Sequence, residues 1–142
     1  MNRVLCGERF VTAVIAEIRE DRTVALLNYG HPSPPMIHSD GTARFLAPKT
    51  RAMPLGLGMR GAQSPETLST AFHPGDLLLL DTDGVSEARG GRGEFHPPGS
   101  RLRLLNADSP ELALDALHSD IVAYVGGPLG DGAAMLLLHY RA

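Results

Sequence analysis

A run of four leucines, residues 77–80, is followed by the acidic segment 81–84 (Asp-Thr-Asp-Gly), and this combination constrains the fold more than any other part of the sequence. A short apolar run bounded by turn residues is typical of a buried strand, and a strand end can hold a carboxylate rigidly. A second apolar run, residues 133–138, follows Asp131 closely. Mg²⁺ and Mn²⁺ prefer carboxylate and water oxygens, so the sequence predicts a hard-cation site if the two acidic segments converge.

The chain has 142 residues, of which 43% are hydrophobic and 20% charged, as in an ordinary globular protein. This length predicts a single domain, residues 1–142. The net charge of −3 and the scattering of the 13 basic residues argue against a nucleic-acid-binding protein. Arg101 and Arg103 come nearest to a basic pair, and we expect them to form a solvent-exposed face.

The sequence also indicates the cellular compartment of the protein. Cys6 is the single cysteine, so no internal disulfide forms, and the first residues lack the apolar segment of a secretory signal. Both features are typical of proteins in the reducing cytoplasm. No apolar stretch reaches the length of about 18 residues that a membrane-spanning helix needs. We therefore predict a cytoplasmic protein that does not enter the membrane.

Most of the chain has the β-branched and apolar composition of strands, punctuated by glycine and proline. The segments that predict strands are residues 10–18, 23–29, 36–38, 42–46, 66–72, 77–80 and 133–140, with a loop or edge strand at 54–58. We expect residues 90–99, which are rich in glycine and proline, to cover the mouth of the site.

One helix is predicted, late in the chain. Ser109 is a good N-cap before Pro110, and Gly126 is a good C-terminal stop. The apolar residues between them fall on one helical face: Leu114, Leu117, Ile121 and Val125. The order of strands and helix favours an α+β fold with antiparallel sheets.

One interpretation of the segment 81–84 is a phosphatase of the haloacid-dehalogenase type, because those enzymes carry Asp-x-Asp-Gly after an apolar strand. That resemblance implies Asp81 as nucleophile, Asp83 as general acid and Asp131 as a magnesium ligand. Such a fold needs several further strand-helix units and a lysine beside the phosphoryl group. The only lysine, Lys49, precedes the motif, so this type of enzyme is the less favoured alternative.

A longer series of motifs resembles a different family. Its most specific parts are a Gly-His-Pro turn at residues 30–32 and the segment 82–89, Thr-Asp-Gly-Val-Ser-Glu-Ala-Arg, and the resemblance extends to residue 141. These motifs resemble the SpoIIE-like branch of the PPM-type metal-dependent protein serine/threonine phosphatases. The resemblance implies a layered α-β-β-α sandwich of antiparallel sheets that holds two Mn²⁺ or Mg²⁺ ions. It also implies hydrolysis of phosphoserine or phosphothreonine in proteins by metal-activated water.

The resemblance assigns roles to individual residues. Asp83 and Asp131 match two of the family's metal ligands, which bind directly or through water. Gly84, which lacks a side chain, would let the backbone pass close to the ions. The turn residues are expected to be architectural: Gly30, His31 and Pro32.

Two positions depart from the family's pattern. Asp81 stands where the family usually has tyrosine, and it would either add negative charge near the ions or face the other side of its strand. Gly132 stands where the family has a second acidic or amide residue, and the missing acceptor would loosen metal binding. Both residues are therefore expected to lie next to the metal ligands.

A third departure lies at the N-terminus. The family's Asp-Gly-x-Gly-x-Gly motif, whose aspartate bridges both ions, does not precede Phe10. We therefore expect an N-terminally incomplete domain, about the C-terminal two-thirds of the family's length, with weak metal binding because few ligands hold a hydrated cation poorly.

By resemblance, the substrate would be a phosphorylated anti-sigma-factor antagonist in bacterial partner-switching signalling. The alternative function is a non-catalytic, truncated phosphatase that binds a phosphoprotein as a regulatory module. Sheet edges left open would also favour a homodimer.

Overall fold

The computed structural model describes residues 10–57, 64–105, 109–130 and 132–142. The chain divides into two compact units: residues 1–31 with 47–71, and residues 32–46 with 72–142. Each unit has its own antiparallel sheet, so the predicted α+β class with antiparallel sheets is confirmed. The prediction of a single domain stays a prediction.

The first unit contains a three-stranded sheet in the order β1-β2-β5. The strands are β1 (Ala13–Ile18), β2 (Thr23–Tyr29) and β5 (Leu68–Ala71), and the β-branched residues of β1 and β2 favour this structure. The central strand β2 buries Val24, Ala25 and Leu26. The predicted loop or edge strand at 54–58 forms one isolated bridge, in which Leu55 and Val11 exchange backbone hydrogen bonds of 2.8 and 2.9 Å.

The second unit contains a four-stranded sheet in the order β4-β3-β6-β7. Its strands are β3 (Pro35–Ile37), β4 (Ala43–Phe45), β6 (Leu77–Asp81) and β7 (Met135–His139). The two apolar runs of the sequence are therefore antiparallel neighbours, with Leu79 opposite Leu137. This pairing brings the end of β6 beside the start of β7.

Among its described residues, the second unit has three helices: α1 (Asp83–Ser86), α2 (Pro98–Leu104) and α3 (Pro110–Val125). The prediction of α3 is confirmed, because the Ser109 hydroxyl accepts a hydrogen bond from the Leu112 amide (3.1 Å) and Gly126 ends the helix with a φ of 83°. The expectation of a single helix is wrong, since α1 and α2 are too short to show a periodic pattern.

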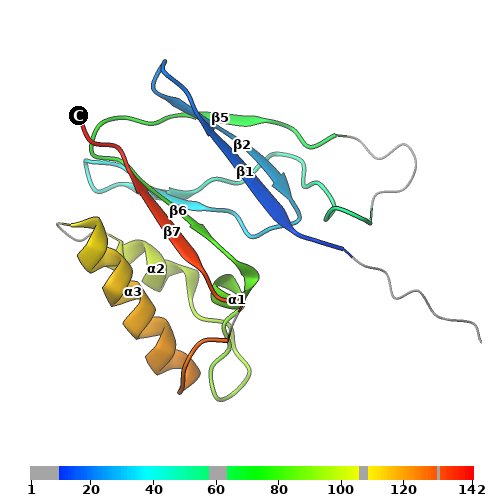
Figure 1. Ribbon diagram of the computed structural model, residues 1–142, viewed down its shortest axis with the longest axis vertical. Coiled ribbons are helices and arrows are strands. Elements are labelled where there is room, and N and C mark those ends of the chain that lie inside the picture. Colours follow the sequence, from blue (N-terminus) through cyan, green and yellow to red (C-terminus); the bar gives the residue numbers. More distant parts are fainter. Residues whose placement is uncertain (1–9, 58–63, 106–108, 131) are drawn as a thin grey trace, which may run out of the picture. The chain divides into compact units, whose positions relative to one another are not determined.

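The helices cover one face of the second unit's sheet. Figure 1 shows α3 alongside β7 and β6, with α2 beside α3. Leu77 and Leu79 of β6 pack in one cluster with Leu117 and Ile121 of α3. Side chains alternate along a strand, so Asp81 lies on the same face as these two leucines, the face covered by the helices.

Candidate metal centre

Asp83 lies at the point where β6 gives way to α1. The strand ends at Asp81, Thr82 is the extended N-cap, and Asp83 is the first residue of the helix. One carboxylate oxygen of Asp83 is buried, and its backbone carbonyl accepts a hydrogen bond from the Glu87 amide (2.8 Å). The backbone of the predicted ligand is therefore held in a defined turn.

Thr82 joins this turn to the segment that precedes β7. Its hydroxyl donates to the Gly132 carbonyl (2.6 Å) and accepts from the Ala134 amide (2.8 Å). Its own amide donates to the Ala134 carbonyl (3.0 Å). These three hydrogen bonds hold the turn that carries Asp83 beside Gly132 and Ala134, just before β7.

Gly84 makes the closest backbone approach in this region. A Cβ atom at Gly84 would lie 2.9 Å from the carbonyl carbon and oxygen of Gly132 and 2.9 Å from the Ala133 nitrogen. Cβ atoms in proteins do not approach backbone atoms so closely, so only glycine fits without displacing the neighbouring segment. Its role at a metal site stays a prediction.

The second predicted ligand, Asp131, lies outside the described residues. Its neighbour Gly132 contacts Thr82 and Gly84, which is consistent with convergence of the two carboxylates but does not test it. Across residues 10–57, 64–105, 109–130 and 132–142 there is no group of three or more His, Cys, Asp or Glu side chains that could hold a metal. The carboxylate of Asp83 has the right chemistry for Mn²⁺ or Mg²⁺, but the donors within those ranges fall short of a complete centre.

Asp81 has a cationic neighbour that the sequence analysis missed. Asp81 Oδ2 lies 3.7 Å from Nη1 of Arg101, and the two side chains are 4% and 6% exposed. Burial lowers the pKa of Arg101, while the charge of Asp81 acts in the opposite direction. The expectation that Arg101 and Arg103 form a solvent-exposed face is therefore wrong for Arg101 and right for Arg103.

A sequence signal for this burial existed. Arg101 and Leu105 are four residues apart and therefore share a face of a helix, and Leu105 is fully buried. The signal is usable only once α2 itself is recognised.

The Gly-His-Pro turn is built by Asn28. The Asn28 side chain donates to the His31 carbonyl and accepts from the His31 amide, both at 2.8 Å. Gly30 has a φ of 69°, and a Cβ there would lie 2.6 Å from Cγ of Pro54. Pro32 follows as the first residue of the second unit. The architectural role expected of Gly30, His31 and Pro32 stays a prediction.

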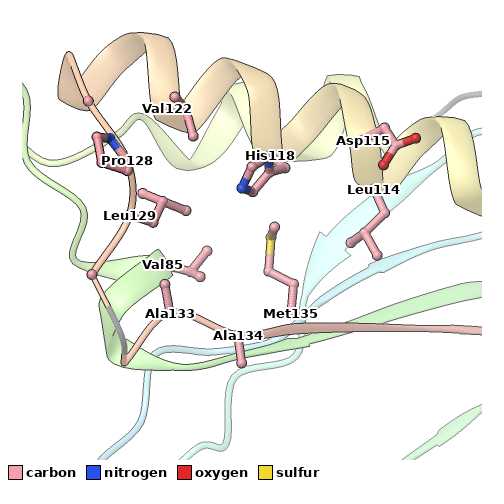
Figure 2. Close-up of a pocket in the computed structure, with 12 residues that line it drawn as sticks. Val85, Leu114, Asp115, His118, Val122, Pro128, Leu129, Ala133, Ala134 and Met135 are labelled. Carbon is pink, nitrogen blue, oxygen red and sulfur yellow. The ribbon is translucent and has the colours of Figure 1, made fainter.

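A cavity of about 730 Å³ lies between α3 and the segment that leads into β7. Figure 2 shows His118 of α3 and Met135 of β7 pointing toward one another across it, among apolar side chains that include Val85. Asp83 does not line the cavity, although Val85 is only two residues away.

In the part of the chain that the structure describes, no helix combines the length and apolarity that crossing a membrane requires.

Comparison with known proteins gives two findings for the sequence. The family model described as stage II sporulation protein E (SpoIIE) matches residues 1–141. No protein in the curated set matches the chain.

Solved structures share the fold. The phosphatase domain of the cell fate determinant SpoIIE from Bacillus subtilis matches with a TM-score of 0.70 and 15% identity, covering 92% of this chain and 59% of that one. The same domain presoaked with Mn matches with a TM-score of 0.68 and 19% identity, covering 92% and 56%. A Mycobacterium tuberculosis protein with RsbU and RsbW domains matches with a TM-score of 0.68 and 24% identity, covering 98% and 39%. The chain thus spans less than two thirds of these relatives, and the expected phosphatase-domain fold is confirmed.

Proposed function

We propose that this chain, which belongs to the family of stage II sporulation protein E (SpoIIE), acts as a metal-dependent phosphatase on phosphoserine or phosphothreonine in proteins. The proposal assigns Asp83 and Asp131 as ligands of Mn²⁺ or Mg²⁺. Such an ion, when bound, supplies the Lewis acidity that activates water and orients the phosphate group.

The observation that carries this proposal is the contact between the turn that contains Asp83 and the residues just before β7. Thr82 hydrogen-bonds Gly132 and Ala134, and Gly84 lies against Gly132, so the backbone on each side of the proposed centre is held in place. A carboxylate that starts from fixed backbone needs less reorganisation to bind a cation. The relative from B. subtilis that was presoaked with Mn supports manganese as the first ion to test.

The substrate that we propose is a phosphorylated anti-sigma-factor antagonist, in the cytoplasm of a bacterium. The relative with RsbU and RsbW domains supports this class of signalling. We expect hydrolysis to depend on Mn²⁺, because carboxylate and water oxygens are the ligands that this cation prefers.

The test compares Asp83→Asn with the wild-type chain in Mn²⁺-dependent hydrolysis of a phosphoserine protein. Asp115→Asn is a matched control, because Asp115 is an exposed aspartate of α3. We expect Asp83→Asn to lower the rate at least about tenfold, the usual scale for weakening a metal site, and Asp115→Asn to leave it unchanged. Removal of metal by EDTA should abolish hydrolysis, and Mn²⁺ should restore it.

Equal rates for the wild type and Asp83→Asn would show that Asp83 is not a ligand. If the wild-type chain binds no Mn²⁺ in calorimetry but still binds the phosphoprotein, the alternative function, a non-catalytic phosphoprotein-binding module, would replace the proposed one.

A further inference from the structure

The most buried cation of the second unit lies beside the candidate metal centre. Arg101 of α2 is only 5% exposed, although arginine is almost never buried unless it is paired. One guanidinium nitrogen, Nη2, donates to the Ser86 carbonyl at 2.9 Å, and Nη1 lies 3.7 Å from Oδ2 of Asp81. Two different nitrogens of one rigid group thus reach two different parts of the chain.

These two contacts lie on either side of Asp83. Asp81 is the last residue of β6, two positions before Asp83, and Ser86 is the last residue of α1, three positions after it. Arg101 therefore contacts both ends of the short segment that carries the proposed ligand.

The segment needs such support because α1 has only four residues. A helix of one turn is unstable on its own, and the carbonyl groups at its C-terminal end lack partners within the helix. The amides of Val85 and Ser86 both donate to the single carbonyl of Thr82, at 2.9 and 3.1 Å. The hydrogen bond from Arg101 gives the Ser86 carbonyl a partner and ties α1 to α2.

We infer that Arg101 is a positioning residue that fixes the direction of the Asp83 carboxylate by holding Asp81 and Ser86 with one guanidinium group. The inference rests on the proposed function only for the role of Asp83 as a metal ligand. Lysine cannot replace this arrangement, because its single ammonium group lacks the planar fork that serves two separated acceptors.

The first test uses Arg101→Lys, which keeps the charge, with Arg103→Lys as the matched control on the exposed side of α2. Amide hydrogen exchange is measured at Val85 and Ser86 in the metal-free chain. We expect Arg101→Lys to speed exchange there about tenfold, the factor for loss of one charge-assisted hydrogen bond, and Arg103→Lys to change nothing. Unchanged exchange in a folded Arg101→Lys chain would overturn the inference.

A second test separates positioning from simple charge balance. The double variant Asp81→Asn/Arg101→Met removes both charges together. Its thermal midpoint should therefore lie close to that of the wild type. Exchange at Val85 and Ser86 should nevertheless stay about tenfold faster, because the bond to the Ser86 carbonyl is still lost. If the double variant regains wild-type exchange, Arg101 only balances the charge of Asp81 and the inference is wrong.

Manganese binding connects the inference to function. The Mn²⁺ concentration for half-maximal binding should rise about tenfold in Arg101→Lys and in the double variant, because a misdirected ligand binds less well. A wild-type chain that binds no Mn²⁺ would contradict the proposed function alone. The exchange rates of metal-free Arg101→Lys would then still decide whether Arg101 fixes α1.

Discussion

Replacement of Gly84 by alanine is the most direct test of how closely α1 approaches the segment before β7. The new methyl group would start 2.9 Å from backbone atoms of Gly132 and Ala133, which cannot rotate away as a side chain would. Overpacking of this kind costs about 1–3 kcal/mol. Alanine gains about 1 kcal/mol over glycine within a helix, and Gly84 belongs to α1, so part of the cost is offset.

The loss of the surrounding hydrogen bonds decides whether Gly84→Ala stabilises or destabilises the chain. To make room, the segment before β7 must move away from Thr82, which weakens bonds worth about 1 kcal/mol each. We therefore expect Gly84→Ala to lower the free energy of unfolding by about 1–3 kcal/mol. This corresponds to a fall of roughly 3–9 °C in the thermal midpoint of a chain of this size.

The assay is thermal unfolding followed by circular dichroism, with Gly99→Ala as the matched control. Gly99 also lies in a short helix, α2, but a Cβ there would meet nothing within 4 Å. The control should raise the free energy of unfolding by up to about 1 kcal/mol, since only the helix propensity changes. If Gly84→Ala proves as stable as Gly99→Ala, the close approach at Gly84 does not exist in solution.

Three further substitutions test other parts of the structure. Thr82→Val removes a hydroxyl that makes two hydrogen bonds, so chemical denaturation should show that the free energy of unfolding falls by about 1–3 kcal/mol. Thr82→Ser keeps the hydroxyl and should retain most of this stability. Gly30→Ala forces a side chain into left-handed backbone and against Pro54, and should cost about 2–4 kcal/mol in the same assay. The Thr42 hydroxyl and, to a smaller extent, the Thr42 amide donate hydrogen bonds to Asp40, and these bonds hold the pKa of Asp40 below its ordinary value. Thr42→Val should therefore raise that pKa in an NMR titration. Because the folded pKa is depressed, the stability that Asp40 contributes is present above its ordinary pKa and is lost as the pH falls through the folded value. An unshifted titration of Asp40 in Thr42→Val would show that the hydroxyl is not responsible.

The strands and α3 follow from local patterns. β1 and β2 contain several β-branched residues, which suit a pleated and partly buried surface, and β6 and β7 are short apolar runs typical of buried strands. Ser109 and Gly126 marked both ends of α3, because each supplies a specific capping geometry. These features depend on neighbours within a few positions, so the sequence alone was sufficient to predict them.

The short helices and the burial of Arg101 depend on distant parts of the chain. α1 and α2 have four and seven residues, too few for a periodic pattern to emerge. Arg101 is buried because Asp81 and Ser86 offer it a counter-charge and an acceptor, and its one local signal, the spacing to Leu105, is usable only once α2 is recognised. The assignment of Asp83 and Asp131 as ligands stays a prediction from the sequence, whereas the contact between Arg101 and Asp81 is seen only in the structure.

The hydroxyl of Thr82 has a consequence for how the chain finds its native pairing. The facing runs of β6 and β7 are largely leucine, so a pairing shifted along the strands by two residues would bury the same kind of side chain on the same face. The apolar pattern therefore selects a face but not a register. Thr82 can hydrogen-bond the backbone before β7 only when Asp81 pairs with Met135. A single hydroxyl therefore distinguishes the native register from its neighbours and sets which residues before β7 lie against the turn that carries Asp83.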